Sequence, residues 1–156
     1  MTGKPAVLFV CLGNICRSPL AEAALKAEAA RIGLDVEVDS AGIGSWHVGE
    51  PPDPRARATA KRHGLDISDY RARKITRADF LRFDHIVALD HEVLAALKRM
   101  RPASSKADVS LLLDHVEGRQ VEEVADPYYG NEADFERVWT EVSAGARTLA
   151  RGLAKR

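Results

Sequence analysis

The residues best suited to chemistry in this sequence lie near its beginning, where Cys11, Gly13, Arg17 and Ser18 follow one another closely. A cysteine supplies a nucleophilic thiolate, and the planar guanidinium of an arginine can bind two oxygens of a phosphate group at once. The Ser18 hydroxyl can donate a hydrogen bond to a thiolate or to a leaving sulfur. Gly13 allows backbone conformations that a side chain would forbid. Together these residue types indicate attack by a thiolate on a bound oxyanion.

The elements on either side of this segment decide where the thiol lies. Residues 6–10 form a short apolar run that predicts a buried strand, and residues 19–32 are rich in helix-forming side chains. Ser18 is a favourable N-cap, and Pro19 suits the first position of a helix. We therefore expect the thiol at the end of a strand, with a short loop leading from it into the N-terminus of a helix.

This placement predicts a binding site for an oxyanion. The first backbone N–H groups of a helix have no partner within the helix, and the helix dipole makes that end positive. A loop that curls around the same point adds further N–H donors, which gives a cradle of phosphate size. The alternative is a structural cysteine beside a solvated arginine. It explains less well why a strand, a glycine and a capped helix surround the pair.

Three segments of the chain resemble the low-molecular-weight protein tyrosine phosphatases. Residues 10–19 resemble the active-site loop of that family, and two further segments resemble motifs that follow it in the same order. These are Asp-Pro-Tyr-Tyr at 126–129 and Asp-Ser-Ala-Gly at 39–42. The chain length also matches, so the resemblance covers essentially the whole sequence, and residues 1–156 are expected to be one such phosphatase domain.

The resemblance implies hydrolysis of phosphotyrosine, an aryl phosphate monoester, through a phosphocysteine intermediate on Cys11. Arg17 would bind the phosphate, and Asp126 would act as general acid and then as general base. From the residues alone, Asp126 before Pro127 is equally well interpreted as the start of a turn. No metal and no cofactor is expected, because Arg17 and the backbone N–H groups supply positive charge and two cysteines alone make no zinc site.

The resemblance also implies a set of surrounding residues. Ser40 and His63 would join Asn14 in a hydrogen-bond network that holds the loop open. From the residues alone, His63 is also interpreted as an imidazole at a helix end. From the residues alone, Trp46 could instead pack in the core, and Tyr128 and Tyr129 could instead pack their loop onto the final helix. The residues expected to bind substrate are Leu12, Gly13, Asn14, Ile15, Cys16, Ser18, Trp46, Tyr128 and Tyr129.

Cys16 allows two interpretations that the sequence does not separate. It could form a disulfide with Cys11 under oxidising conditions, which would give a redox-sensitive and reversible off state. It could also be a small residue that fills space behind the loop.

Composition limits the range of functions and locations. The chain has 156 residues, 46% of them hydrophobic, and its 23 basic and 23 acidic residues give a net charge of zero. This balance argues against general binding to nucleic acid or to a membrane surface. No stretch has transmembrane length, and the beginning of the chain lacks a signal-peptide pattern. We expect a cytoplasmic monomer or weak dimer that acts on a phosphotyrosine-containing protein.

Strand-like and helix-like segments alternate along the chain, which predicts a single-domain α/β fold with a parallel sheet and helices on both faces. The Cys11 loop would lie at the carboxyl end of the first strand, where such sheets bind ligands. The resemblance implies four parallel strands in the order 2-1-3-4. After the first strand and helix, we expect strands at 36–41, 85–89 and 108–113, and helices at 55–63, at 91–101 and from 131.

Four other functions compete with this hypothesis. An arsenate reductase on the same fold needs further cysteines, which this chain lacks. Phosphoarginine phosphatases of the same family carry a threonine where this chain has Ile15, and an apolar side chain suits an aryl ester better. A phosphocarrier domain that accepts a phosphoryl group on cysteine would not need both Arg17 and Asp126. A phosphate-binding module would keep its function after replacement of Cys11 by serine.

Overall fold

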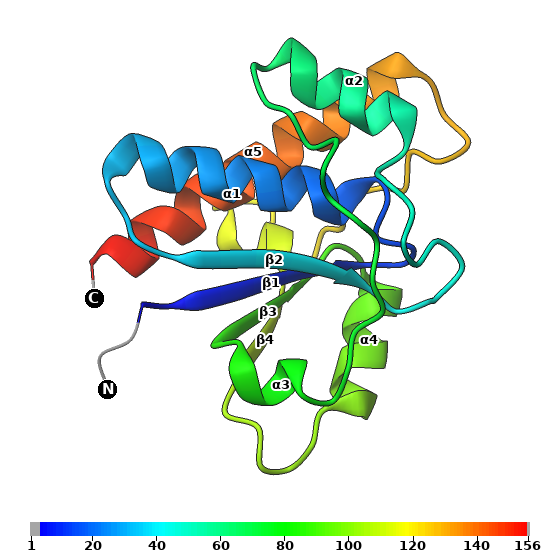
Figure 1. Ribbon diagram of the computed structural model, residues 1–156. Helices are drawn as coiled ribbons and strands as arrows, with labels where there is room; N and C mark the ends of the chain where they lie inside the picture. Colours follow the sequence, from blue (N-terminus) through cyan, green and yellow to red (C-terminus); the bar gives the residue numbers. More distant parts are fainter. Residues whose placement is uncertain (1–3, 156) are drawn as a thin grey trace.

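The computed structural model describes residues 4–155 of the chain. Within them, four strands form one parallel sheet in the order β2-β1-β3-β4, which confirms the predicted α/β fold (Figure 1). Helices α1, α2 and α5 lie on one face of the sheet, and α3 and α4 lie on the other. The elements are β1 (Ala6–Cys11), α1 (Arg17–Ile32), β2 (Glu37–Gly42), α2 (Pro54–Arg62), α3 (Asp79–Arg82), β3 (His85–Ala88), α4 (His91–Met100), β4 (Asp108–Leu111), the 3-10 helix η1 (Leu112–His115) and α5 (Glu132–Ala154).

Strand β1 lies at the centre of the sheet and contributes to two hydrophobic cores. Val7 and Phe9 pack in the core beneath α1 and α5, whereas Leu8 and Val10 pack in the core beneath α3 and α4. All four side chains are fully buried. They alternate because successive side chains of a strand point to opposite faces, and helices cover both faces of this sheet. The strand that ends in Cys11 is therefore held on both sides.

Helix α5 is the longest helix and closes one of these cores. It is capped by Asn131, whose side chain accepts from the backbone N of Asp134, while the Asp134 carboxylate accepts from the backbone N of Asn131. Trp139 is only partly buried. The apolar residues that recur at helical spacing along α5 are buried: Phe135, Val138, Val142, Ala146, Leu149 and Leu153.

Helix α1 begins two residues earlier than predicted, at Arg17, with Cys16 in the N-cap position. The prediction that Ser18 caps this helix is wrong, because its hydroxyl lies 2.9 Å from the Cys11 sulfur and no side chain caps the helix. Pro19 still lies in the first turn, where a missing backbone N–H removes no helical hydrogen bond. The first turn of α1 thus provides part of the site.

Strand β4 ends at Leu111, so the prediction that it continues to residue 113 is wrong. The chain turns into η1 instead, and Leu112 is buried against α5. Helix α5 comes so close here that a Cβ atom on Gly145 would lie 2.5 Å from Cδ1 of Leu112. Contact with a distant helix, which the local sequence does not reveal, therefore ends the strand.

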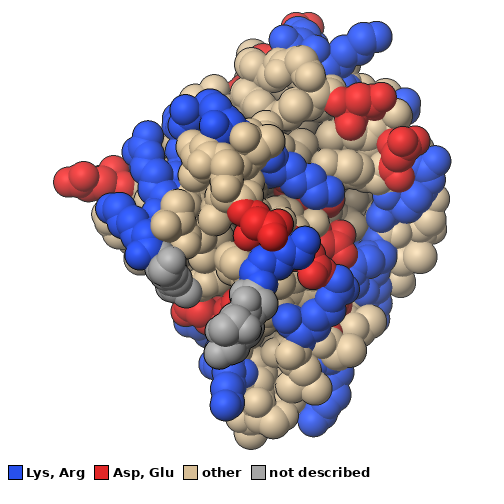
Figure 2. Space-filling view, turned by 60° about the vertical axis from the view of Figure 1, so that its left-hand side comes forward, with Lys and Arg blue, Asp and Glu red and all other residues tan. Residues whose placement is uncertain are grey.

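The surface in Figure 2 mixes charges of both signs. On this face Lys and Arg side chains lie among Asp and Glu side chains, without one large patch of a single sign. Among residues 4–155, none of the helices combines the length and the apolar character that crossing a membrane would require.

A buried carboxylate at the start of α3 allows a test of the stability of this fold. Asp79 accepts hydrogen bonds from both terminal nitrogens of Arg73, each at 3.0 Å, and from the backbone N of Thr76 at 2.7 Å. Burial by itself would raise the pKa of Asp79, but these hydrogen bonds outweigh it, and the pKa lies below its ordinary value. We expect Asp79→Asn to lower the free energy of unfolding by about 2 kcal/mol near pH 7.

The pH dependence of this loss follows from the direction of the pKa shift. The carboxylate stabilises the folded state above the unfolded-state pKa of Asp79, at about pH 4, and this contribution disappears as the pH falls towards the lower folded-state pKa. Urea unfolding at several pH values should show the two proteins converging below about pH 4. Asp35→Asn, at an exposed carboxylate 3.7 Å from Lys4, should cost less than about 0.5 kcal/mol. A constant difference at all pH values would contradict the assignment.

Candidate active site

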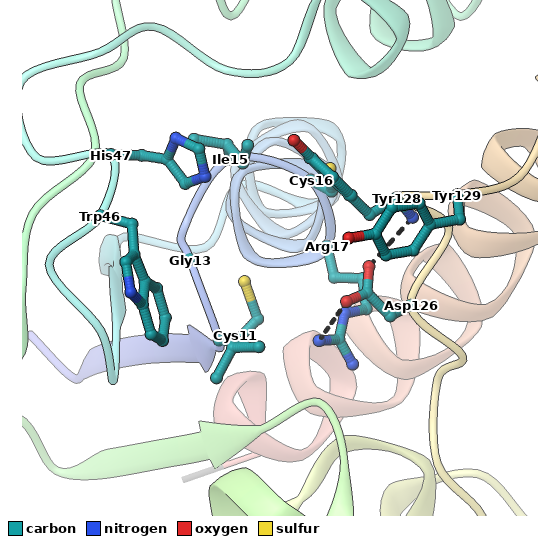
Figure 3. Close-up of a pocket in the computed structure, with 11 residues that line it drawn as sticks. Cys11, Gly13, Ile15, Cys16, Arg17, Trp46, His47, Asp126, Tyr128 and Tyr129 are labelled. Carbon is teal, nitrogen blue, oxygen red and sulfur yellow. Dashed lines mark hydrogen bonds and ion pairs between the residues drawn. The ribbon is translucent and has the colours of Figure 1, made fainter.

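Cys11 is the last residue of β1, so the sheet places its thiol at the carboxyl end of the central strand. Its sulfur lies 2.9 Å from the Ser18 hydroxyl and accepts a hydrogen bond from the backbone N of Asn14 at 3.3 Å. Figure 3 shows the sulfur pointing into a pocket, with Trp46 on one side and Asp126 on the other. A hydroxyl and a backbone N–H directed at one sulfur can stabilise negative charge on it.

Asn14 holds the loop in shape from behind. It has a φ of 59°, in the left-handed region that asparagine tolerates better than most residues. Its side-chain Nδ2 donates to the hydroxyls of Ser18 at 2.8 Å and Ser40 at 3.0 Å. Its Oδ1 accepts from the backbone N of Arg73 at 3.0 Å. Ser40 lies on β2, where the predicted network requires it, so one side chain ties the loop to two distant segments.

The prediction that His63 joins this network is wrong. His63 lies at the end of α2, where its Nε2 is 2.8 Å from the Glu136 carboxylate and its ring stacks on Trp139 with centroids 4.8 Å apart. Both partners belong to α5. The imidazole therefore helps to join α2 to α5 and does not contact Asn14 or Ser40.

Glu22 and Lys26 continue the network instead. The Ser40 hydroxyl donates to the Glu22 carboxylate at 2.6 Å, which also accepts from the Lys26 ammonium at 2.6 Å. That ammonium lies 4.8 Å from the centre of the Tyr70 ring. Burial raises the pKa of Glu22 above its ordinary value. The spacing of Glu22 and Lys26 by four residues on α1 is a sequence signal for this pair.

Arg17 is almost completely buried, and one edge of its guanidinium is fixed. Its Nη1 donates to the Asp90 carboxylate at 2.7 Å and to the backbone oxygen of Val124 at 3.0 Å. Its Nη2 lies 3.7 Å from the carboxylate of Asp126. Burial opposes the charge, but Cys11 and Asp90 outweigh it and raise the pKa of Arg17. The pocket therefore contains a fixed cation with one terminal nitrogen towards Asp126 (Figure 3).

Asp90 serves two elements with its two carboxylate oxygens. One oxygen accepts from Arg17, and the other accepts from the backbone N of Val93 at 2.8 Å, which caps α4. The cap fixes the orientation of the carboxylate, so helix α4 holds the guanidinium of Arg17 indirectly.

Asp126 lies in the loop before α5 and faces the pocket across from the Cys11 sulfur (Figure 3). Its carboxylate is half exposed. One of its oxygens accepts from the backbone N of Tyr128 at 3.1 Å, so the turn expected from Asp126 and Pro127 is also present. The carboxyl group thus combines a fixed backbone with an open path to solvent, as a group that exchanges protons with substrate and water requires.

The pocket has a volume of about 280 Å³ and an aromatic rim. Trp46 is 67% exposed and does not pack in the core, and the Tyr129 side chain, 96% exposed, does not pack onto the final helix. Tyr128 meets Tyr129 edge to face at 4.9 Å. The pocket is lined by Cys11, Leu12, Gly13, Ile15, Cys16, Arg17, Trp46, His47, Asp126, Tyr128 and Tyr129.

His47 and Arg55 are residues of this site that the sequence did not suggest. His47 lines the pocket beside Gly13, where a Cβ atom would lie 3.1 Å from the imidazole ring. Its position directly after Trp46 is the one local signal for it. Arg55 lies outside the pocket and binds the loop that carries Tyr128, through the backbone oxygen of that residue. Nothing in its local sequence indicates this contact.

The two cysteines differ in their surroundings, and both are free. Burial is the main cause that raises the pKa of Cys16 above its ordinary value, and nearby Asp53 and Cys11 raise it further. Cys16 is therefore a protonated thiol near neutral pH. In the described part of the chain, no three His, Cys, Asp or Glu side chains converge where they could hold a metal ion.

Comparisons with known proteins agree on one family. The family model described as "Low molecular weight phosphotyrosine protein phosphatase" matches residues 6–156. The low molecular weight protein-tyrosine-phosphatase YfkJ of Bacillus subtilis is 40% identical over 153 residues, 96% of each chain. Its counterpart in Streptomyces coelicolor is 45% identical over 149 residues, 92% of this chain and 90% of the relative.

Solved structures agree with the sequence relatives. The crystal structure of YfkJ from Bacillus subtilis matches with a TM-score of 0.91 and 38% identity, over 99% of this chain and 97% of that one. The structure of DARP, a Drosophila arginine phosphatase, matches with a TM-score of 0.88 and 34% identity, over 94% of this chain and 96% of that one.

Proposed function

Because this chain belongs to the low molecular weight phosphotyrosine protein phosphatase family, and is thus a protein-tyrosine phosphatase, we propose that it works through a phosphocysteine on Cys11. The observation that carries the proposal is the pocket that the Cys11 sulfur shares with Arg17 and Asp126, which lie together on one side of it. An attacking sulfur, a fixed cation and a proton donor are the groups that this reaction needs.

In the first step, the Cys11 thiolate attacks phosphorus in line with the bond to the phenolic oxygen. The S–P bond forms as the P–O bond breaks, and Asp126 transfers its proton to the departing oxygen. Arg17 and the N–H groups of the loop bind the non-bridging oxygens, where charge redistributes in the transition state. The Nη2 atom of Arg17, 3.7 Å from the Asp126 carboxylate, is placed to turn to the phosphate instead.

In the second step, water attacks the phosphocysteine. Asp126, now ionised, takes a proton from the water, and inorganic phosphate leaves as the S–P bond breaks. The Ser18 hydroxyl, 2.9 Å from the sulfur, donates to the departing thiolate. The contact from Asn14 to Ser18 keeps this hydroxyl in place.

The pocket walls favour an aryl ester as substrate. Trp46, Tyr128 and Tyr129 are exposed at the rim, and Ile15 adds an apolar surface beside the loop. Such walls contact the ring of phosphotyrosine and exclude water from it. The likeness to an arginine phosphatase makes phosphoarginine the second candidate. On the first candidate, the natural substrate is a phosphotyrosine-containing protein. The proposal includes a monomeric or weakly dimeric enzyme that acts in the cytoplasm.

Steady-state kinetics with a substrate panel test this function. We expect the reduced protein to hydrolyse p-nitrophenyl phosphate and a phosphotyrosine peptide in the presence of a chelator, because Arg17 and the loop supply the positive charge. The value of kcat/KM for phosphotyrosine should exceed that for phosphoserine by about 100-fold or more, since phosphoserine leaves the aromatic walls uncovered. Faster hydrolysis of phosphoarginine would reverse the order of the two candidates. Absence of turnover in folded protein would overturn the proposal.

The two free cysteines belong to the same proposal. Cys11 is the residue that we expect an oxidant to attack first, because its sulfur points into the pocket beside the Ser18 hydroxyl and the backbone N of Asn14, whereas burial raises the pKa of the Cys16 thiol. Condensation of the resulting sulfenic acid with Cys16 would release water and leave a reversible disulfide.

A further inference from the structure

The segment that carries Asp126 has no regular secondary structure, and Arg55 on α2 holds it. The Nη2 atom of Arg55 donates to the backbone oxygen of Tyr128 at 2.9 Å, and Nη1 donates to that of Gly130 at 3.2 Å. The same guanidinium lies 4.7 Å from the centre of the Phe135 ring in the first turns of α5. One side chain therefore binds the segment from 126 to 130 at two backbone positions.

The other side of Arg55 is bound to the phosphate-binding loop through Asp53. The Asp53 carboxylate accepts from Nε of Arg55 at 3.0 Å and from Nη2 at 2.9 Å. The backbone N of Asp53 donates to the backbone oxygen of Ile15 at 2.9 Å. Asp53 also caps α2, which fixes the direction of its carboxylate. A continuous series of contacts thus joins the loop of the nucleophile to the loop of the acid.

We propose that Arg55 is a positioning residue that holds Asp126 at the distance from the Cys11 loop needed for proton transfer to the leaving group. This inference rests on the acid role of Asp126 under the proposed function. The link to Asp126 is short, because Tyr128, whose backbone oxygen Arg55 binds, donates its backbone N to the Asp126 carboxylate at 3.1 Å. Arg55 does not line the pocket, so it acts through the loop and not on the substrate.

Arginine suits this place because its guanidinium is a rigid planar fork with five donors. Arg55 uses the fork for a carboxylate on one side and two backbone oxygens on the other. A lysine carries the same charge but cannot donate in one plane to three separated acceptors. The contact therefore fixes a geometry, and its loss should affect the step that depends most on geometry, which is protonation of the leaving group.

The test compares substrates with good and poor leaving groups. p-Nitrophenolate leaves readily without a proton, whereas the phenolate of phenyl phosphate depends strongly on the general acid. We expect Arg55→Met, which retains apolar contact with Phe135, to lower kcat/KM for phenyl phosphate about tenfold and for p-nitrophenyl phosphate less than about threefold. Asp126→Asn should show the same selectivity with a larger effect. Adding Arg55→Met to Asp126→Asn should change the rate by less than about twofold.

Arg57→Met is the matched control, because Arg57 lies on the same helix and donates to the backbone oxygen of Pro52 instead. It should lower both rates equally and by less than about twofold. An Arg55→Met variant that loses the same factor on both substrates would show a merely structural role and overturn the inference. If Asp126→Asn also lowers kcat/KM by the same factor on both substrates, Asp126 is not the general acid. The proposed function on which the inference about Arg55 rests is then wrong in that part. If Arg55→Met melts below the assay temperature, Arg55→Lys replaces it. Arg55→Lys should also lower kcat/KM more for phenyl phosphate than for p-nitrophenyl phosphate, with a smaller difference between the two.

Discussion

Replacing Cys11 with serine should lower kcat for aryl phosphates by at least about 10⁴-fold, the largest effect that we expect from any single substitution. A serine hydroxyl attacks phosphorus only if a base removes its proton. The neighbours of the Cys11 sulfur are the Ser18 hydroxyl at 2.9 Å and the backbone N of Asn14 at 3.3 Å, and neither group is a base. A hydroxyl and a backbone N–H can stabilise a thiolate at this position, but they cannot remove the proton of a serine.

Rapid-quench measurement of the first turnover tests this expectation directly. The wild-type protein should accumulate a phosphoryl group that is stable to quenching and assigned to Cys11 by mass spectrometry, and Cys11→Ser should accumulate none. The dissociation constant of inorganic phosphate from Cys11→Ser should differ from the wild-type value by less than about fivefold, because Arg17 and the loop remain. Cys16→Ser is the matched control and should retain most of the turnover, since burial keeps the Cys16 thiol protonated. More than about 1% of wild-type kcat in Cys11→Ser would contradict a covalent mechanism.

The parts of the site that the sequence predicted are those built from neighbouring residues. Cys11, the loop and the start of α1 occupy one continuous segment, and their order alone placed a thiol between a strand and a helix N-terminus. The burial of β1 on both faces followed from the apolar run at residues 6–10. Local rules act within a few residues, so a site assembled within one segment can be inferred from that segment.

The features that the sequence did not reveal depend on contacts between distant segments. His63 was interpreted through a resemblance and through its place at a helix end, but Glu136 and Trp139, more than seventy residues away, determine where its imidazole lies. Arg55 likewise binds Tyr128, and its local sequence shows only a charged residue in the first turn of a helix. A charged side chain near a helix end is most often solvated, so nothing local distinguishes it.

Two local rules compete at Ser18, and the structure confirms the predicted contact with the thiol but not the predicted helix cap. A serine before a proline is a good helix cap, and a serine seven residues after the cysteine can also contact the thiol. The structure resolves the competition in favour of the thiol, at the cost of a helix without a side-chain cap. Departures from local rules are expected at functional sites, and this one occurs at the centre of the pocket.

Replacing Arg17 with lysine should lower kcat/KM for aryl phosphates by about 10³-fold, although the charge is retained. Nη1 of Arg17 is used twice, on Asp90 and on the backbone oxygen of Val124, and Nη2 is left for the phosphate. A lysine has one nitrogen for both purposes. If its ammonium remains on Asp90, the phosphate loses its cation, and if it turns to the phosphate, a largely buried Asp90 loses its partner.

Both outcomes weaken binding of the transition state and of a phosphate ion. For p-nitrophenyl phosphate kcat/KM should therefore fall, and the inhibition constant for inorganic phosphate should rise with it. Arg31→Lys is a matched control on the same helix, because Arg31 is exposed and pairs with Glu28 outside the pocket, and it should change kcat/KM by less than about twofold. Circular dichroism and thermal melting establish that both variants are folded. If Arg17→Lys keeps more than about a tenth of the wild-type kcat/KM, then charge alone is sufficient, and the fixed fork of Arg17 is not what stabilises the transferring phosphoryl group.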